Sequence, residues 1–311
     1  MTTDGFKTLV VVNPNSSNGR TGRIWPDLQA ELSKRIGTFE HRFTSRQGEG
    51  EALARDALQA GFEMVVSVGG DGTHSEVANG FFADGIPIRT DAVLGVVTSG
   101  TGGDLRRTLG MDKGPFAALD RLSGTTVRPH DVGRYTFVDA QGVRRTRVFI
   151  NILSFGIGGL VDKLVNSTTK ALGGKASFFI ATLRALARFS PPEVTVELDE
   201  GEPRTARIHN VAVAIGRFFG GGMEVAPEAR PDDGLFDVVG FEGMSTFGFV
   251  SLGGSIYKGR HLARPNVTLA RARRIVARCD QAEVLLDVDG EQPGRLPLEI
   301  EILPGALKIK S

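Results

Sequence analysis

A glycine-rich turn that carries an acidic residue is the most informative chemical feature of the sequence. The segment reads Val65-Val66-Ser67-Val68-Gly69-Gly70-Asp71-Gly72-Thr73-His74-Ser75-Glu76. An apolar strand leads into glycines, whose missing Cβ lets backbone N–H groups approach an anion, and a helix start with unpaired N–H donors follows. This arrangement suits a phosphate group. Asp71 would repel a bare phosphate, so its position indicates that Mg²⁺ or a transferred proton lies between the two.

Part of this turn also has a purely structural interpretation. Thr73 and Glu76 have the Thr-x-x-Glu spacing of a capping box, which a helix start can use without any ligand. Glycine-rich strand-to-helix turns are common, so this spacing alone is moderate support for a function. The sequence has no Gly-x-x-x-x-Gly-Lys-[Ser/Thr] P-loop, and no Gly-x-Gly-x-x-Gly follows the first strand, which excludes two common nucleotide motifs.

Two further turns follow apolar strands. Asn13-Pro14-Asn15-Ser16-Ser17-Asn18-Gly19 ends the first strand, and Ser99-Gly100-Thr101-Gly102-Gly103-Asp104 ends a later one. In the later turn Thr101 and Asp104 repeat the capping spacing. Turns at the carboxyl ends of parallel strands lie at one edge of a sheet, where α/β folds bind ligands. We therefore expect the three turns to form one site, with a nucleotide as its simplest occupant.

Two acids lie on one tight turn near the end of the sequence. Asp289 and Glu291 flank Gly290 after the apolar run Val284 to Val288. A general base beside a metal-linked acid would need two acids placed in this way. The alternative is that Asp289-Gly290 is simply a hairpin turn, which this dipeptide also predicts.

The elements that must position these turns alternate between strands and helices over the first part of the chain. Strands joined by helices predict a parallel sheet. From about residue 128, shorter strand-like runs separated by turns predict a mostly β domain that helices interrupt at Ala176–Phe189 and Thr246–Gly259. In the first part we expect strands at Lys7–Val12, Phe62–Val68 and Ala92–Val97, and helices at Trp25–Ile36, Glu51–Ala60, His74–Phe82 and Asp104–Leu109.

Length and composition limit the class of protein. A chain of 311 residues exceeds the usual size of one hydrophobic core, so two domains are expected. The 37 basic and 36 acidic residues nearly cancel, which disfavours nucleic acid as a partner. Cys279 is the single cysteine, so no intramolecular disulfide can form and a reducing cytoplasm is favoured. We expect no secretory signal and no transmembrane segment, because no apolar stretch approaches about 18 residues.

The combined motifs resemble a known family. Asn13-Pro14 with Ser16, then Gly69-Gly70-Asp71-Gly72-Thr73, then Gly100-Thr101-x-x-Asp104 are similar to bacterial lipid kinases with a diacylglycerol-kinase catalytic domain, relatives of sphingosine and ceramide kinases. NAD kinases and 6-phosphofructokinases share the Gly-Gly-Asp-Gly core. The segment Pro227 to Asp237 and the turn Asp289-Gly290-Glu291 resemble the C-terminal signatures of the lipid kinases, so the resemblance runs from about residue 7 almost to the end.

The resemblance implies a fold class of α/β plus all-β. A Rossmann-like α/β nucleotide-binding domain at residues 1–128 would precede a C-terminal β-sandwich domain at residues 129–311. The active site would lie in the inter-domain cleft, and the last residues could pack back on the first domain.

The resemblance also implies site residues. Glu291 would accept the proton of the lipid hydroxyl, with Asp71 and Asp289 as the other catalytic acids. Mg²⁺ would bind Asp233 and the backbone carbonyls of Arg230 and Leu235, a donor set that suits a hard cation. The residues expected to bind ATP are Asn13, Pro14, Asn15, Ser16, Ser17, Thr44, Gly70, Asp71, Gly72, Thr73, His74, Ser75, Glu76, Thr101 and Asp104.

The sequence departs from the family pattern at several positions of the three turns. Thr98-Ser99 stands where the family usually has a proline before Gly-Thr, and Gly103 stands where it has an asparagine. Ser17 replaces a common glycine, and His74 and Ser75 replace leucine and asparagine. We expect a more flexible loop at Gly103, and nucleotide affinity and donor preference stay open.

We therefore expect an ATP- and Mg²⁺-dependent lipid kinase that is cytoplasmic, associates peripherally with the inner face of the membrane and forms either a monomer or a homodimer. An NAD kinase-like enzyme and a non-catalytic nucleotide-binding regulator are the alternatives. Diacylglycerol, phosphatidylglycerol, monoacylglycerol and a sphingoid base all stay open as acceptors. The helix at Ala176–Phe189 and the basic run from Arg271 to Arg278 could contact anionic lipid, although a packed helix and a solvated face are the simpler interpretations.

Overall fold

The structure is a computed structural model that describes residues 5–100, 102–117, 119–124, 126–161 and 189–310. The chain forms two compact units. Unit 1 comprises Met1–Val132, Arg147–Ile150 and Leu303–Ser311, and unit 2 comprises Gly133–Thr146 and Asn151–Ile302. The expected helix at Ala176–Phe189 lies almost entirely outside the described residues.

Unit 1 contains a parallel sheet in the order β18-β6-β3-β1-β2. Its strands are β1 (Thr8–Val12), β2 (Glu40–Phe43), β3 (Met64–Gly69), β6 (Val93–Thr98) and the last residues of β18 (Gly294–Lys310). The helices are α1 (Ser16–Ile36), α2 (Glu49–Gln59), α3 (Asp71–Asn79), α4 (Asp104–Thr108) and the 3₁₀ turn η1 (Leu119–Leu122), and β4 (Phe82–Ala83) and β5 (Ile86–Pro87) form a small hairpin.

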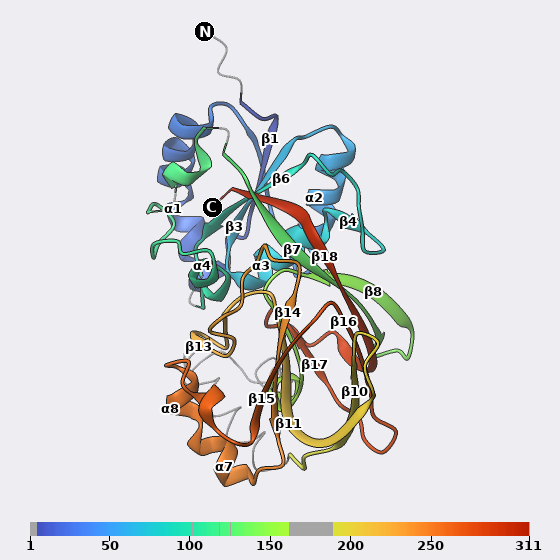
Figure 1. Cartoon of the computed structure of the whole chain (residues 1–311). Helices are drawn as coiled ribbons and strands as arrows, with labels where there is room; N and C mark the ends of the chain where they lie inside the picture. The colour runs from blue at the N-terminus through green and yellow to red at the C-terminus, as the bar shows by residue number, and fades with distance from the viewer. Residues whose placement is uncertain (1–4, 101, 118, 125, 162–188, 311) are drawn as a thin grey trace. The chain divides into compact units, whose positions relative to one another are not determined.

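Helices cover both faces of this sheet (Figure 1). Alternate residues of β1 point to opposite faces, as the pleat requires. Leu9 and Val11 pack into one buried cluster with α2, whereas Val10 and Val12 pack into another with α1. Because both faces are buried, the central strands are continuous apolar runs rather than alternating ones.

Unit 2 consists mainly of antiparallel strands. One sheet path runs β15-β14-β11-β10-β16-β18, while β9 pairs with β11 and β17, and β7 pairs with β8 and β18. Three strands, β7 (Arg128–Asp139), β8 (Arg144–Phe149) and β18, continue from one unit into the other.

The other strands of unit 2 are β9 (Ile152–Gly156), β10 (Glu193–Leu198), β11 (Arg204–Ala214), β14 (Phe236–Glu242), β15 (Val267–Ala272), β16 (Arg274–Arg278), β17 (Leu286–Val288) and the hairpin of β12 (Phe218–Phe219) and β13 (Met223–Glu224). The helix expected at Thr246–Gly259 is present as α7 (Thr246–Ser251) and α8 (Gly253–Ile256), which the 3₁₀ turn η3 (His261–Ala263) follows. No helix in the described ranges is long and apolar enough to cross a membrane.

Candidate functional site

The three turns expected to form one site follow three adjacent strands of unit 1, β1, β3 and β6. Asn13 N donates to Val68 O at 2.9 Å, and Ser99 N donates to Gly69 O at 2.6 Å, so the chain stays paired as it leaves the sheet. Gly70 and Gly100 come so close that a Cβ on Gly100 would lie 2.7 Å from the Cα of Gly70. The turns meet as expected, and glycine is required where they meet.

Asn13 joins the first turn to α3. Its Nδ2 donates to Thr73 Oγ1 at 3.0 Å, and its Oδ1 accepts a hydrogen bond from Asn15 N at 3.0 Å. Both halves of the amide are therefore engaged, which fixes its orientation. Asn13 holds the first turn against the glycine-rich turn in which Thr73 lies.

A chain of hydroxyl groups joins the first and third turns. Ser16 Oγ lies 2.5 Å from Thr21 Oγ1, which lies 2.6 Å from Ser99 Oγ. Ser99 makes an N–H bond to Gly69 that a proline at this position could not make. Thr21 and Ser99 were not predicted as site residues, because a lone threonine or serine in a helix or turn carries no sequence signal.

Asp71 is the first residue of α3, and its carboxylate reaches the third turn. Oδ2 accepts a hydrogen bond from Gly103 N at 2.7 Å, and Oδ1 accepts one from Leu105 N at 3.2 Å. A Cβ on Gly102 would lie 2.7 Å from Oδ2, so this position also needs glycine. Asp71 therefore bridges the start of α3 and the start of α4.

Gly103 adopts a left-handed conformation, with φ 70° and ψ 41°. Glycine and asparagine are the residues that most readily adopt it. The replacement of the family's asparagine therefore removes a side chain but is compatible with this backbone. Next to it, Asp104 is buried and its Oδ1 accepts a hydrogen bond from Arg107 Nη1 at 2.8 Å.

The first turn contains a left-handed run inside α1. Ser17, Asn18 and Gly19 have φ of 54°, 57° and 76°. A glycine at position 17 would adopt this conformation without strain, whereas serine bears a cost of roughly 1 kcal/mol.

The capping-box interpretation of Thr73 and Glu76 is wrong. The helix begins at Asp71 with Gly70 as its N-cap, and it has no side-chain cap. Glu76 instead accepts hydrogen bonds from Gly48 N at 2.8 Å and Gly50 N at 3.1 Å. A carboxylate is favourable at a helix N-terminus, so Glu76 holds the start of α2.

Burial separates the residues expected to bind ATP into two groups. The partly exposed ones, Asn13, Pro14, Asn15, Ser16, Ser17, Gly70, Asp71, Gly72 and Glu76, include the turn residues that can face a ligand. The buried ones are Thr44, Thr73, His74, Ser75 and Asp104. Thr44 N donates to Val12 O at 2.9 Å and so ties the end of β2 to β1. Thr101 lies outside the described residues.

His74 is fully buried and joins β3 to β6. Its Nδ1 lies 2.8 Å from Ser67 Oγ, and its Nε2 lies 3.3 Å from Thr98 Oγ1. Burial disfavours the imidazolium and lowers the pKa of His74 to about 4, while the negative charge of Asp71 partly opposes this shift. The ring is therefore neutral at pH 7, and its contribution to the site is structural support.

The acidic turn of unit 2 is a two-residue hairpin. Asp289 and Gly290 have φ of 51° and 87°, and Val288 and Glu291 exchange backbone hydrogen bonds of 2.8 and 2.9 Å. Asp289 Oδ1 accepts hydrogen bonds from Asn151 N at 3.1 Å and from Ile152 N at 3.0 Å. The turn is therefore a hairpin, as the dipeptide predicts, and Asp289 connects it to β9.

Asp287 is an acid of this turn that the sequence analysis missed. Its Oδ1 accepts a hydrogen bond from Gly290 N at 3.1 Å, and its Oδ2 accepts one from Ser154 Oγ at 3.3 Å. The signal was available, because acids at positions 287, 289 and 291 repeat with the period of a strand. Among the described residues no group of three or more Asp, Glu, His or Cys side chains could hold a metal ion.

The carboxylate of Asp233 is paired with an arginine side chain. Asp233 Oδ1 accepts a hydrogen bond from Leu235 N at 3.1 Å, and Oδ2 forms an ion pair with Arg271 Nη2. Arg271 Nε also donates to Asp237 Oδ1 at 3.0 Å. Burial raises the pKa of Asp237, and the charge of Arg271 opposes that shift. As they stand, these residues do not fit Mg²⁺, because a guanidinium occupies the carboxylate that would bind it.

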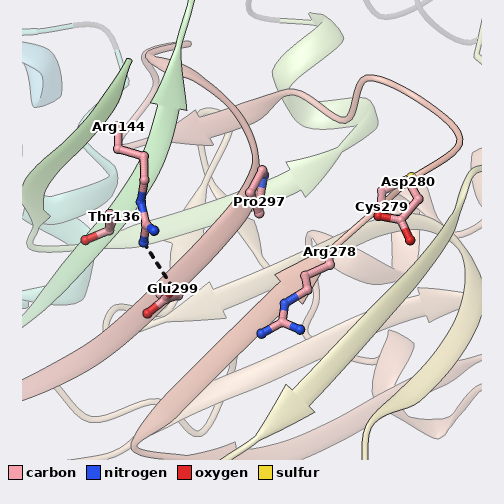
Figure 2. Close-up of a pocket in the computed structure, with 7 residues that line it drawn as sticks. All are labelled: Thr136, Arg144, Arg278, Cys279, Asp280, Pro297 and Glu299. Atoms are coloured by element: carbon pink, nitrogen blue, oxygen red, sulfur yellow. Dashed lines mark hydrogen bonds and ion pairs between the residues drawn. The ribbon is translucent and has the colours of Figure 1, made fainter. Parts of the chain in front are cut away.

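Unit 2 also has a hollow of about 340 Å³ that lies apart from the predicted site residues. Figure 2 shows its lining, in which Arg144 comes from β8 and Arg278 from β16, and Arg144 pairs with Glu299 of β18 at 3.1 Å. The other lining residues are Thr136, Cys279, Asp280 and Pro297. None of the predicted site residues lines this hollow.

Comparison with known proteins covers both halves of the chain. Residues 7–135 match the family described as diacylglycerol kinase catalytic domain, and residues 151–311 match the YegS C-terminal NAD kinase beta sandwich-like domain. "Diacylglycerol kinase" of Mycobacterium tuberculosis (strain H37Rv) is 28% identical over 304 residues, covering 97% of this chain and 94% of that protein. "Probable lipid kinase YegS-like" of Pseudomonas aeruginosa (strain PAO1) is 30% identical over 318 residues, covering 98% and 94%.

A solved structure supports the fold. The crystal structure of a diacylglycerol kinase from Bacillus anthracis (strain Sterne) matches with a TM-score of 0.73 and 20% identity, covering 99% of this chain and 98% of that one. The expected fold class, α/β plus a β-sandwich-like domain, is confirmed. The chain belongs to the family of ATP-dependent lipid kinases that join a diacylglycerol kinase catalytic domain to a YegS-type C-terminal domain.

Proposed function

We propose that this protein transfers the γ-phosphate of MgATP to the hydroxyl group of diacylglycerol or a related lipid at a membrane surface. The observation that carries the proposal is the meeting of the three turns at the carboxyl ends of β1, β3 and β6. Backbone N–H groups at the start of α3 are available there for phosphate oxygens. The match of both halves of the chain to lipid kinase families supports phosphoryl transfer as the reaction.

The transfer depends mainly on position and charge, since phosphoryl transfer needs little covalent help from the protein. The glycines at positions 70 and 72 let the backbone approach the phosphates. When MgATP is bound, Asp71 and Asp104 would orient its Mg²⁺ and the accompanying water, and Asn13, Thr73 and the buried His74 hold the turns in place. The other residues expected to bind ATP, including Thr101 and Glu76, stay predictions.

Glu291 is the proposed proton acceptor for the lipid hydroxyl. It lies at the closing pair of the hairpin and is partly exposed. Asp289 and Asp287 are engaged with backbone N–H groups and shape the turn on which Glu291 lies. Because its carboxylate accepts these backbone hydrogen bonds, Asp289 acts in the proposal as a positioning residue and Glu291 as the base. The cleft expected between the two domains stays a prediction.

A second, structural Mg²⁺ at Asp233 with the carbonyls of Arg230 and Leu235 also stays a prediction. It requires that Arg271 first leave Asp233. A cytoplasmic location with peripheral attachment to the inner face of the membrane is part of the proposal, because the lipid acceptor resides in a bilayer. The choice between monomer and homodimer stays open.

The proposal is tested by incubating the purified protein with MgATP labelled on the γ-phosphate and with vesicles that contain one candidate acceptor each. Labelled lipid is expected from diacylglycerol or a related lipid, and Asp71→Asn should abolish it. Asp27→Asn, at an exposed position of α1, is the matched control and should retain wild-type transfer. A parallel incubation supplies NAD in place of the vesicles, and labelled NADP there, with no labelled lipid, would support the NAD kinase alternative. ATP binding without any transfer would support the regulator.

A further inference from the structure

The helices α7 and α8 of unit 2 are apolar on the side that faces the protein. Leu252 and Ile256 are each 5% exposed. The Phe249 ring stacks on His209 with 5.1 Å between centroids and meets Phe241 edge-on at 5.6 Å. Figure 1 shows the two helices together at one edge of unit 2. This side therefore provides the attachment of the helices to the core.

The opposite side of the same helices is also apolar. Phe247, Val250 and Tyr257 are 84%, 49% and 53% exposed. The backbone stays right-handed helical at Leu252, between the two helices, and at Tyr257. Residues three and seven positions apart therefore share one side of the helix. A surface helix normally presents polar residues there, so this outer face of Phe247, Val250 and Tyr257 marks an interaction surface.

The charged residues that follow the outer face along the chain are all positive, and the one carboxylate given near them, Glu224 beside Gly259, is paired with Arg217. Lys258, Arg260 and Arg264 follow it directly and are exposed. No Asp or Glu occurs from Gly243 to Cys279. An apolar face bordered by lysine and arginine is complementary to an anionic bilayer, whose acyl region accepts the rings and whose headgroups attract the cations.

We propose that the outer face and these three cations form the surface with which the protein docks on an anionic membrane. The inference rests on the proposed function in one respect, namely that the acceptor is embedded in a bilayer. A second copy of the chain is a poorer occupant, because a symmetric contact would bring like charges together. Three side chains also provide far less than the roughly 1,200 Å² that a stable interface buries.

The docking surface is tested by sedimentation with vesicles of phosphatidylcholine, with and without phosphatidylglycerol. Phe247→Ser should lower the partition coefficient about tenfold, because it removes most of the apolar area that would insert. Lys258→Gln combined with Arg260→Gln should lower it about tenfold or more on vesicles with phosphatidylglycerol. Ile86→Ser, at a 63% exposed position of unit 1, is the matched apolar control and should bind as wild type.

A second assay separates docking from catalysis. The docking variants should phosphorylate a short-chain diacylglycerol dissolved in water as fast as wild type, but should lose activity on vesicles. If the wild-type protein binds vesicles but phosphorylates no lipid, the proposed function is refuted, whereas the docking surface is still supported. If Phe247→Ser matches wild type in both assays, the docking surface is wrong. Dissociation of a dimer by Phe247→Ser, with vesicle binding unchanged, would assign the face to a second copy and overturn the proposal.

Discussion

Acidification should destabilise unit 1 through His74. In the folded protein burial lowers the pKa of His74 to about 4, whereas an exposed histidine titrates near 6.5. Between these two values the unfolded chain binds a proton that the folded chain does not. The contribution of His74 to stability is therefore fully present above pH 6.5 and is lost progressively as the pH falls towards 4.

The size of the effect follows from the same two values. At pH 5.5 the unfolded histidine is mostly protonated and the folded one is not, which lowers the free energy of unfolding by about 1.4 kcal/mol relative to high pH. Between pH 7.5 and 5.5 the loss from His74 is about 1.3 kcal/mol. Burial also lowers the pKa of His209 and His261 in unit 2, so a variant is needed to isolate His74.

Urea denaturation of wild type and His74→Asn at pH 7.5 and 5.5 measures this loss. Trp25 is the single tryptophan and is buried in unit 1, so its fluorescence follows the unfolding of that unit. An asparagine amide can still reach Ser67 but does not titrate. The variant should be less stable at both pH values, yet it should lose about 1.3 kcal/mol less than wild type on acidification. An equal loss in both proteins would refute the argument from burial.

Three further predictions concern the acids. Asp71→Asn should lower turnover at least a hundredfold, and it should lower the free energy of unfolding by about 1–2 kcal/mol because the amide of the new asparagine would face a backbone N–H. Steady-state kinetics measure the turnover and urea denaturation measures the stability. Unchanged turnover would remove Asp71 from catalysis. Glu291→Gln should slow phosphoryl transfer by roughly two to four orders of magnitude while ATP affinity stays near wild type, and Asp289→Asn should slow the transfer less. Single-turnover assays measure both rates. A slower transfer in Asp289→Asn than in Glu291→Gln would make Asp289 the base. Mg²⁺ should raise the melting temperature of nucleotide-free Arg271→Gln more than that of wild type, since the guanidinium competes for Asp233, and should not raise that of Asp233→Ala. An equal response in all three proteins would remove Mg²⁺ from this turn.

Local patterns were sufficient to predict the fold class and the meeting of the three turns. The apolar run Phe62–Val68 followed by glycines can only be a buried strand that ends in a close approach, and Gly70 and Gly100 do lie against each other. The dipeptide Asp289-Gly290 predicts a hairpin because both residues tolerate positive φ, and the structure has it. In these cases the neighbouring residues along the chain determine the geometry.

Partners distant in sequence could not be predicted. Glu76 has the spacing of a capping residue for its own helix, but its partners are Gly48 and Gly50 on another helix. The strand Glu40–Phe43 lies at the edge of its sheet and has mostly exposed side chains, so no apolar pattern marks it.

The ion pair at Asp233 shows the same limit. Arg271 lies directly opposite Asp237 in the pairing of β14 with β15, which brings its guanidinium to Asp233 as well. A register of this kind depends on the pairing of two strands that the sequence does not align. The motif therefore predicted Asp233 as a metal ligand without indicating that Arg271 pairs with it.

The strand β18 completes the sheet of unit 1, but the ribosome makes it only after most of unit 2. Leu307 and Ile309 of β18 belong to the core of unit 1, and Lys308 to Lys310 pair with β6. A ribosome adds about 5–20 residues per second, so unit 1 waits roughly ten to thirty seconds after Val132 emerges, while most of unit 2 is synthesised. During that time β6 exposes an unpaired edge, which is the part of the nascent chain most open to misassociation. A chaperone that shields this edge would protect the nascent chain until β18 emerges and pairs with β6.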